Sequence, residues 1–162
     1  MPFRAFALKV DPKAFTHSRL TRLGMVPNPI TLSDHLKNQR LGRGLSVVAA
    51  ARLMAADPSV IRKWENEHRD PSVEVWPRIL KFLGFYPYPT VGNISAQVLM
   101  LRRIEGASTT HFGRHYGSNA TTVKRWESGE LRPHPRALPI IQEMLDKAKI
   151  PRIEASGAPN GT

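Results

Sequence analysis

The chain has 162 residues, of which 41% are hydrophobic and 23% charged, and its formal net charge is +11 at pH 7. It contains no cysteine, which excludes a disulfide framework and a cysteine-ligated zinc site. No apolar run reaches the roughly 18 residues of a membrane-spanning helix. The basic excess is spread along the whole chain and favours a polyanion such as nucleic acid as partner.

The first residues lack the continuous apolar stretch of a signal peptide, because Lys9, Asp11 and Lys13 interrupt it. We therefore expect a cytoplasmic protein without a membrane association. Residues 1–30 are rich in basic residues and proline, and we expect them to form an extended, basic N-terminal arm.

The main feature of the chain is an internal repeat. Gly44–Pro71 recurs without a gap as Gly106–Pro133, at an offset of 62 residues (from 44 to 106). The residues that coincide at this offset include Arg40 with Arg102, Ser46 with Ser108, Trp64–Glu65 with Trp126–Glu127, and Pro71 with Pro133. A fixed period indicates one supersecondary unit used twice. Units of about 55–60 residues have small cores, so we expect them to support each other.

Helix-start and helix-stop signals divide the first unit, 31–86, into short helices. Thr31 begins the first helix, and the Gly42-Arg-Gly44 run ends it. Ser46 can cap a helix over 47–54, and Asp57 with Pro58 opens a third that extends to about residue 66. A fourth helix is expected between Ser72 and Gly84.

The second unit, 93–148, follows a stiff proline-rich linker over 87–92. Its helices are expected near 93–103, 109–116, 119–128 and 135–148, and residues 149–162 are expected to form a flexible tail. Neither unit has an alternating strand pattern, so the predicted class is all-α. The predicted architecture is two tandem helical bundles of about four to five short helices each.

In each unit a helix rich in small residues is followed by a tight turn and a helix that ends in Trp-Glu, which is typical of a helix-turn-helix. Gly44–Pro71 and Gly106–Pro133 resemble the Cro/XRE-type repressor family of DNA-binding proteins. The resemblance covers roughly 31–86 and 93–147. It implies that Arg40 contacts Glu65 and that Arg102 contacts Glu127, each in a bidentate arrangement that joins the first helix to the third. Trp64 and Trp126 are expected to fill the cores.

Two departures from the family pattern concern phosphate binding and a turn. The family usually begins its second helix with a phosphate-binding glutamine, where this chain has Val47 and Thr109. The glycine that follows Trp-Glu in the family is Glu67 in the first unit and Gly129 in the second. A left-handed turn would be costly at Glu67. The second unit therefore matches the family better.

The resemblance also implies which residues contact double-stranded DNA. The first turns of the third helix would enter the major groove, with Pro58, Ser59, Arg62 and Lys63 facing bases in the first unit and Ala120, Thr121, Lys124 and Arg125 in the second. Phosphate contacts are expected from Asn66, Arg69, Thr109, Ser128 and Arg132.

No enzyme site, cofactor or metal site is predicted. His111 and His115 have metal-ligand spacing but lack a clear third ligand in the sequence. We expect a sequence-specific transcriptional regulator with two helix-turn-helix units. The alternative is a protein-interaction module, such as an antitoxin-like partner, in which one unit has lost DNA binding. The sequence leaves open the oligomeric state (including a homodimer), the operator and the direction of regulation.

Overall fold

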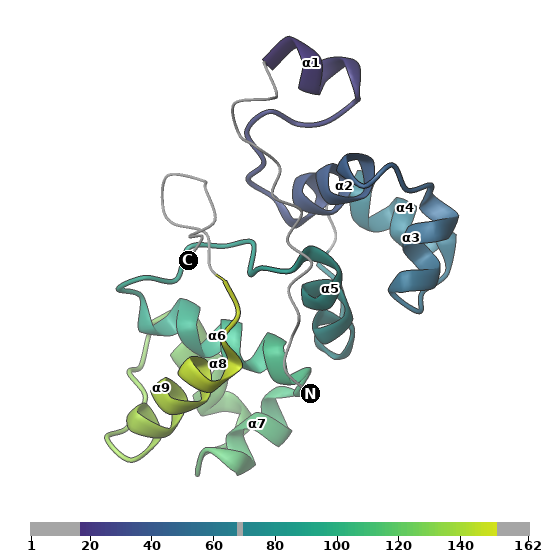
Figure 1. The fold of residues 1–162 in the computed structure, drawn as a ribbon. Coiled ribbons are helices and arrows are strands. Elements are labelled where there is room, and N and C mark those ends of the chain that lie inside the picture. Colours follow the sequence, from purple (N-terminus) through teal and green to yellow (C-terminus); the bar gives the residue numbers. More distant parts are fainter. Residues whose placement is uncertain (1–16, 68–69, 152–162) are drawn as a thin grey trace.

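The computed structural model describes residues 17–67 and 70–151, and the described chain is helical (Figure 1). The helices are, in chain order, α1 (His17–Arg22), α2 (Leu32–Gly42), α3 (Val47–Leu53), α4 (Pro58–Asn66), the 3₁₀ helix η2 (Val73–Val75), α5 (Trp76–Leu83), α6 (Ile94–Glu105), α7 (Thr109–His115), α8 (Ala120–Ser128) and α9 (Ala137–Ala148). No described residue belongs to a strand element. The predicted all-α class is confirmed.

Polar caps begin the helices of the first half where the sequence predicts them. The Thr31 hydroxyl accepts a hydrogen bond from the Asp34 amide at 3.2 Å, and the Asp34 carboxylate accepts one from the Thr31 amide at 3.0 Å. This reciprocal capping box satisfies amides that the first turn of α2 leaves free. The Ser46 and Asp57 side chains cap α3 and α4 by accepting hydrogen bonds from the Ala49 and Ser59 amides, and Pro58 follows Asp57 as the first residue of α4.

The first half is a bundle in which α2 packs against α4 and α5, and α3 packs against α4. Its core contains Leu36, Ile61 and Ile79, none of which is exposed to solvent. The small residues Ala50 and Ala51 of α3 are also buried. Burial of the apolar face of each short helix supplies most of the stability, because such helices are marginal in isolation.

In the second half α6 packs against α8 and α9, and α7 packs against α8. A Cβ atom at Gly113 of α7 would lie 2.9 Å from the backbone carbon of Asn119, the residue that caps α8. Real Cβ atoms do not approach so closely, so only glycine fits here. Gly113 therefore lets α8 begin close against α7.

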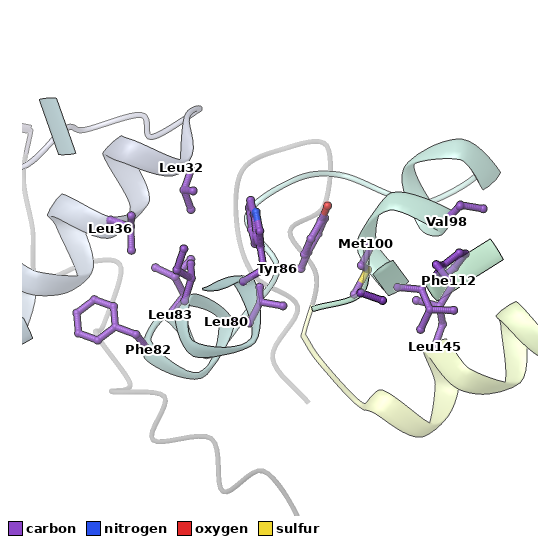
Figure 2. Packing of buried hydrophobic residues seen from close by; sticks show 14 of the residues in the cluster. Leu32, Leu36, Leu80, Phe82, Leu83, Tyr86, Val98, Met100, Phe112 and Leu145 are labelled. Carbon is purple, nitrogen blue, oxygen red and sulfur yellow. The ribbon is translucent and has the colours of Figure 1, made fainter. Parts of the chain in front are cut away.

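The two halves share one buried apolar cluster. Figure 2 shows its side chains continuing from Leu36 through Leu80 to Tyr86 and Met100. Both α5 and η2 of the first half contact α6 of the second.

The structure differs from the sequence-based expectation at three places. Residues 17–22, expected within an extended arm, form α1. The fourth helix of the first half is a 3₁₀ turn followed by α5, which begins only at Trp76, because Pro77 lacks the amide hydrogen that an earlier α-helical start would need. The last helix begins at Ala137 rather than residue 135, after the His134 ring accepts a hydrogen bond from the Ala137 amide at 3.1 Å.

Candidate nucleic-acid interface

The helix α4 has one buried and one exposed face. Ile61 is fully buried and Trp64 is 7% exposed, so this face belongs to the core as predicted. The opposite face carries the polar and basic residues that the sequence singled out for DNA contact. Those that are solvent-exposed are Ser59, Arg62, Lys63 and Asn66.

The helix α8 repeats this division. Val123 and Trp126 are fully buried, which confirms the core role predicted for the tryptophan. Thr121, Lys124, Arg125 and Ser128 are solvent-exposed. Pro58 and Ala120, which begin α4 and α8, are half-buried.

A bidentate ion pair holds α2 against the end of α4. The Nε atom of Arg40 lies 2.7 Å from Oε1 of Glu65, and its Nη2 atom lies 2.8 Å from Oε2. The remaining Nη1 donates to the Leu45 carbonyl oxygen at 3.2 Å. The side chains are 12% and 5% exposed, and the hydrogen bond with Glu65 raises the pKa of Arg40 above its ordinary value. The predicted pair is confirmed.

The second half contains the same arrangement between α6 and α8. Nη2 of Arg102 lies 3.0 Å from Oε2 of Glu127, and Nε bonds to the other carboxylate oxygen. Nη1 donates to the Ala107 carbonyl oxygen at 3.2 Å. This pair is also confirmed. Each pair therefore fixes the C-terminal end of α4 or α8, and with it the direction of the exposed basic face.

The turns that precede α4 and α8 both need a left-handed residue. Gly117 has a φ angle of 67°, and Ala55, at the matching position of the repeat, has a φ angle of 47°. Such a conformation suits glycine but strains alanine. Sequence reasoning missed this strained position, although the alignment of Ala55 with Gly117 was available in the repeat.

The two helices end differently. Gly129 ends α8 with a left-handed φ angle of 81°, whereas Glu67 ends α4 with φ −98° and ψ 0° in the right-handed region. The chain thus avoids the left-handed turn that would be costly at Glu67. Arg69, a predicted phosphate contact, lies outside the described residues.

An acidic side chain lies beside the exposed face of α8. Oε2 of Glu130 is 3.4 Å from Nε of Arg125, and Oε1 is 3.2 Å from the Ser128 hydroxyl. The Arg125 and Glu130 side chains are 52% and 65% exposed. Sequence reasoning did not identify Glu130, because the turn at Gly129 is what returns the chain toward Arg125.

The remaining predicted contacts are accessible to different degrees. Thr109 is the first residue of α7 and is half-buried, and Arg132 is exposed between α8 and α9. Val47, at the start of α3, is half-buried and has no side-chain donor for a phosphate.

Neither a metal site nor a membrane-spanning helix occurs in the part of the chain that the structure describes. There, His, Asp and Glu side chains form no group of three with metal-binding geometry, and His111 and His115 are both exposed. Within the same ranges, every helix is too short or too polar to cross a membrane.

A comparison with known protein families gives a match for the first half of the chain only. A helix-turn-helix family model of the Cro/XRE type matches residues 36–89, about a third of the chain, which include α3, α4 and α5. Searches of curated proteins and of solved structures found no match. The matched family is one of DNA-binding transcriptional regulators, which suggests this function for the first half.

Proposed function

We propose that this protein is a sequence-specific DNA-binding transcriptional regulator with two helix-turn-helix units, 31–86 and 93–148, in one chain. The supporting observation is that α4 and α8 each carry an exposed basic face behind an equivalent arginine–glutamate pair. An α-helix held in this way can enter the major groove of DNA. The net charge of +11 favours approach to the phosphate backbone.

Base contacts are assigned to the first turns of α4 and α8. Ser59, Arg62 and Lys63 act in the first unit, and Thr121, Lys124 and Arg125 act in the second. Arginine and lysine donate to the O6 and N7 atoms of guanine, and the methyl group of threonine packs against that of thymine. Because the two sets differ, the two half-sites should differ, and the operator need not be a palindrome.

Phosphate contacts are assigned to residues at the borders of these helices. Asn66 is the last residue of α4, and Arg69 comes three positions later in the sequence; Ser128 is the last residue of α8, Arg132 follows it, and Thr109 begins α7. These contacts position the protein without selecting a sequence.

The direct test is binding to genomic DNA fragments by fluorescence anisotropy over a series of salt concentrations. Each phosphate neutralised contributes a slope of about −0.9 in log K against log salt. We expect a steep decrease in affinity with salt. Affinity that is unchanged between low and physiological salt would reject the proposal.

One observation favours a different role for the first unit. Val48 and Leu53 of α3 are 44% and 62% exposed, whereas Thr110 and His115 occupy the matching positions of α7. An apolar surface at this place suits a protein partner more than phosphate. The second candidate function is therefore a protein-interaction module in which only the second unit contacts DNA.

The double substitution Val48→Thr and Leu53→His separates the two candidates, because it gives α3 the residues of α7. If α3 borders DNA, affinity for DNA should rise, because the apolar side chains are replaced by polar ones beside the phosphates. If the surface binds a protein or a second copy of the chain, the substitution should abolish that association in sedimentation or co-purification experiments and leave DNA binding unchanged.

A further inference from the structure

The side chain of Arg103 crosses from the second half of the protein to the first. It belongs to α6, but its guanidinium carbon lies 4.0 Å from the ring centroid of Trp76 and 5.3 Å from that of Tyr88. Its Nη1 atom donates a hydrogen bond of 3.1 Å to the Tyr86 hydroxyl, and its Nη2 atom lies 3.7 Å from Oδ2 of Asp70. One cation thus contacts α5, the linker and the segment before η2.

The surroundings of Arg103 are largely closed to water. The Arg103 side chain is 11% exposed, and Trp76 and Tyr86 are each 1% exposed. Trp76, Tyr86 and Tyr88 form a mutual aromatic cluster with centroid separations of 5.8–6.3 Å. A guanidinium in such a place needs its aromatic and hydrogen-bonding partners, because an unpaired buried charge is costly. Separation of the halves would remove these partners, so the free-energy cost of losing them opposes separation.

Two further contacts restrict the same junction. A Cβ atom at Gly106, which ends α6, would lie 2.9 Å from Cγ of Pro77 in α5, so the two helices approach at a point where a side chain does not fit. The amide of Tyr86 donates a hydrogen bond of 2.8 Å to the carbonyl oxygen of Pro151, beyond α9. The last residue of the first unit is thus bound to the segment that follows α9, and the two halves contact each other on both sides of the linker.

We propose that Arg103 and its aromatic partners hold α4 and α8 in one fixed geometry, so that the protein accepts only one spacing and orientation of two half-sites in double-stranded DNA. This inference rests on the proposed function. Half-sites follow the DNA helix, whose turn of 10–10.5 base pairs spans about 34–36 Å. Inserting one base pair therefore moves and rotates one half-site relative to the other. A flexible linker could follow this change, but a fixed junction cannot.

Arg103 is a positioning residue in this account, and its effect should appear in the dependence on spacing. After half-sites are selected from a random DNA pool, affinity is measured on duplexes whose spacer is lengthened or shortened by one to five base pairs. We expect the unmodified chain to lose at least tenfold in affinity for a change of one base pair. Arg103→Ala should lose less than threefold, although its best affinity is lower. Arg103→Lys retains a cation over Trp76 and should restore part of the spacing preference.

Arg136→Ala is the matched control, because it removes the same charge from an exposed position between α8 and α9. It should lower affinity evenly and leave the spacing profile unchanged. Circular dichroism establishes whether Arg103→Ala folds. If it does not, Tyr86→Phe removes only the hydroxyl acceptor and should broaden the profile in the same direction. An equally narrow profile in the folded Arg103→Ala protein, or in Tyr86→Phe, would overturn the inference.

Residual dipolar couplings measured on the DNA-free chain test the fixed junction independently of the proposed function. We expect one alignment tensor for both halves, and two in Arg103→Ala. Two tensors in the unmodified chain would overturn the fixed junction even if DNA is bound. A single tensor together with no DNA binding would overturn the proposed function and support the junction.

Discussion

At the scale of single residues, the strained turn at Ala55 has a measurable consequence. Its φ angle of 47° costs an L-residue about 1–2 kcal/mol, whereas glycine adopts it freely. Ala55→Gly should therefore raise the free energy of unfolding by about 0.5–1 kcal/mol, after subtraction of the greater freedom of glycine in the unfolded chain. Urea unfolding measures this change.

The control for Ala55→Gly is Ala49→Gly in the interior of α3, which should lower the free energy of unfolding by about 1 kcal/mol. A loss of stability in both variants would contradict the strain assigned to Ala55.

His35 of α2 makes stability depend on pH. It is 5% exposed, its Nε2 atom has no hydrogen-bond partner among the described residues, and its ring meets that of Phe85 at a centroid distance of 5.5 Å. Burial lowers the pKa of His35 below its ordinary value of 6.5, and the charge of Asp34 opposes this only in part. The unfolded chain therefore takes up a proton at a higher pH than the folded one, and stability is lost as the pH falls below about 6.5.

We expect the free energy of unfolding to decrease between pH 7 and pH 5.5, and His35→Leu to flatten this decrease. The exposed His111→Gln serves as control and should keep the slope of the unmodified chain. Thermal melts at several pH values provide the measurement, and an unchanged slope in His35→Leu would contradict the assignment.

Removal of either glutamate from the two ion pairs should destabilise its own half. Glu65→Ala leaves Arg40 in a mostly buried place without its partner, which costs roughly 3–5 kcal/mol where burial is deep. Glu127→Ala should cost less, because the Glu127 side chain is 14% exposed against 5% for Glu65. Chemical unfolding of both variants tests the order as well as the size, and two unchanged midpoints would reject the structural role of these pairs.

At the scale of helices, the exposed face of α8 is partly neutralised by Glu130. The carboxylate lies 3.4 Å from Nε of Arg125, so Arg125 must exchange this contact for a base or a phosphate when it binds DNA. Glu130→Gln should therefore raise the affinity for DNA about 1.4- to fivefold, since an exposed ion pair is worth roughly 0.2–1 kcal/mol. Filter binding at two salt concentrations tests it, with Glu143→Gln on α9 as control. A weaker complex would indicate that Glu130 orients Arg125 for binding.

Local signals predicted most of the helices. Thr31, Ser46 and Asp57 accept hydrogen bonds at the helix starts where their residue types predict caps. The Arg40–Glu65 pair followed from the family resemblance. The start of α5 at Trp76 was not predicted, because it depends on the position of Pro77 within the first turn.

At the scale of the whole molecule, the junction between the halves was beyond sequence reasoning. Arg103 contacts Trp76, 27 positions earlier (from 76 to 103), and nothing in helical periodicity or capping indicates that a helix of one half will place a cation on an aromatic ring of the other. The sequence indicated only that two small cores would support each other. The contact itself follows from tertiary packing of α5 against α6.

The central claim is that both α4 and α8 select bases, and selection of bound sequences from a random DNA pool tests it most directly. Lys63→Ala and Arg125→Ala should each relax the preference at one base pair, at different positions of the selected sequence, and each should cost about 1–3 kcal/mol on the unmodified site. Arg136→Ala should leave the selected sequence unchanged. If Lys63→Ala and Arg125→Ala both select the same sequence as the unmodified chain, these helices do not contact bases through these residues and the account is contradicted.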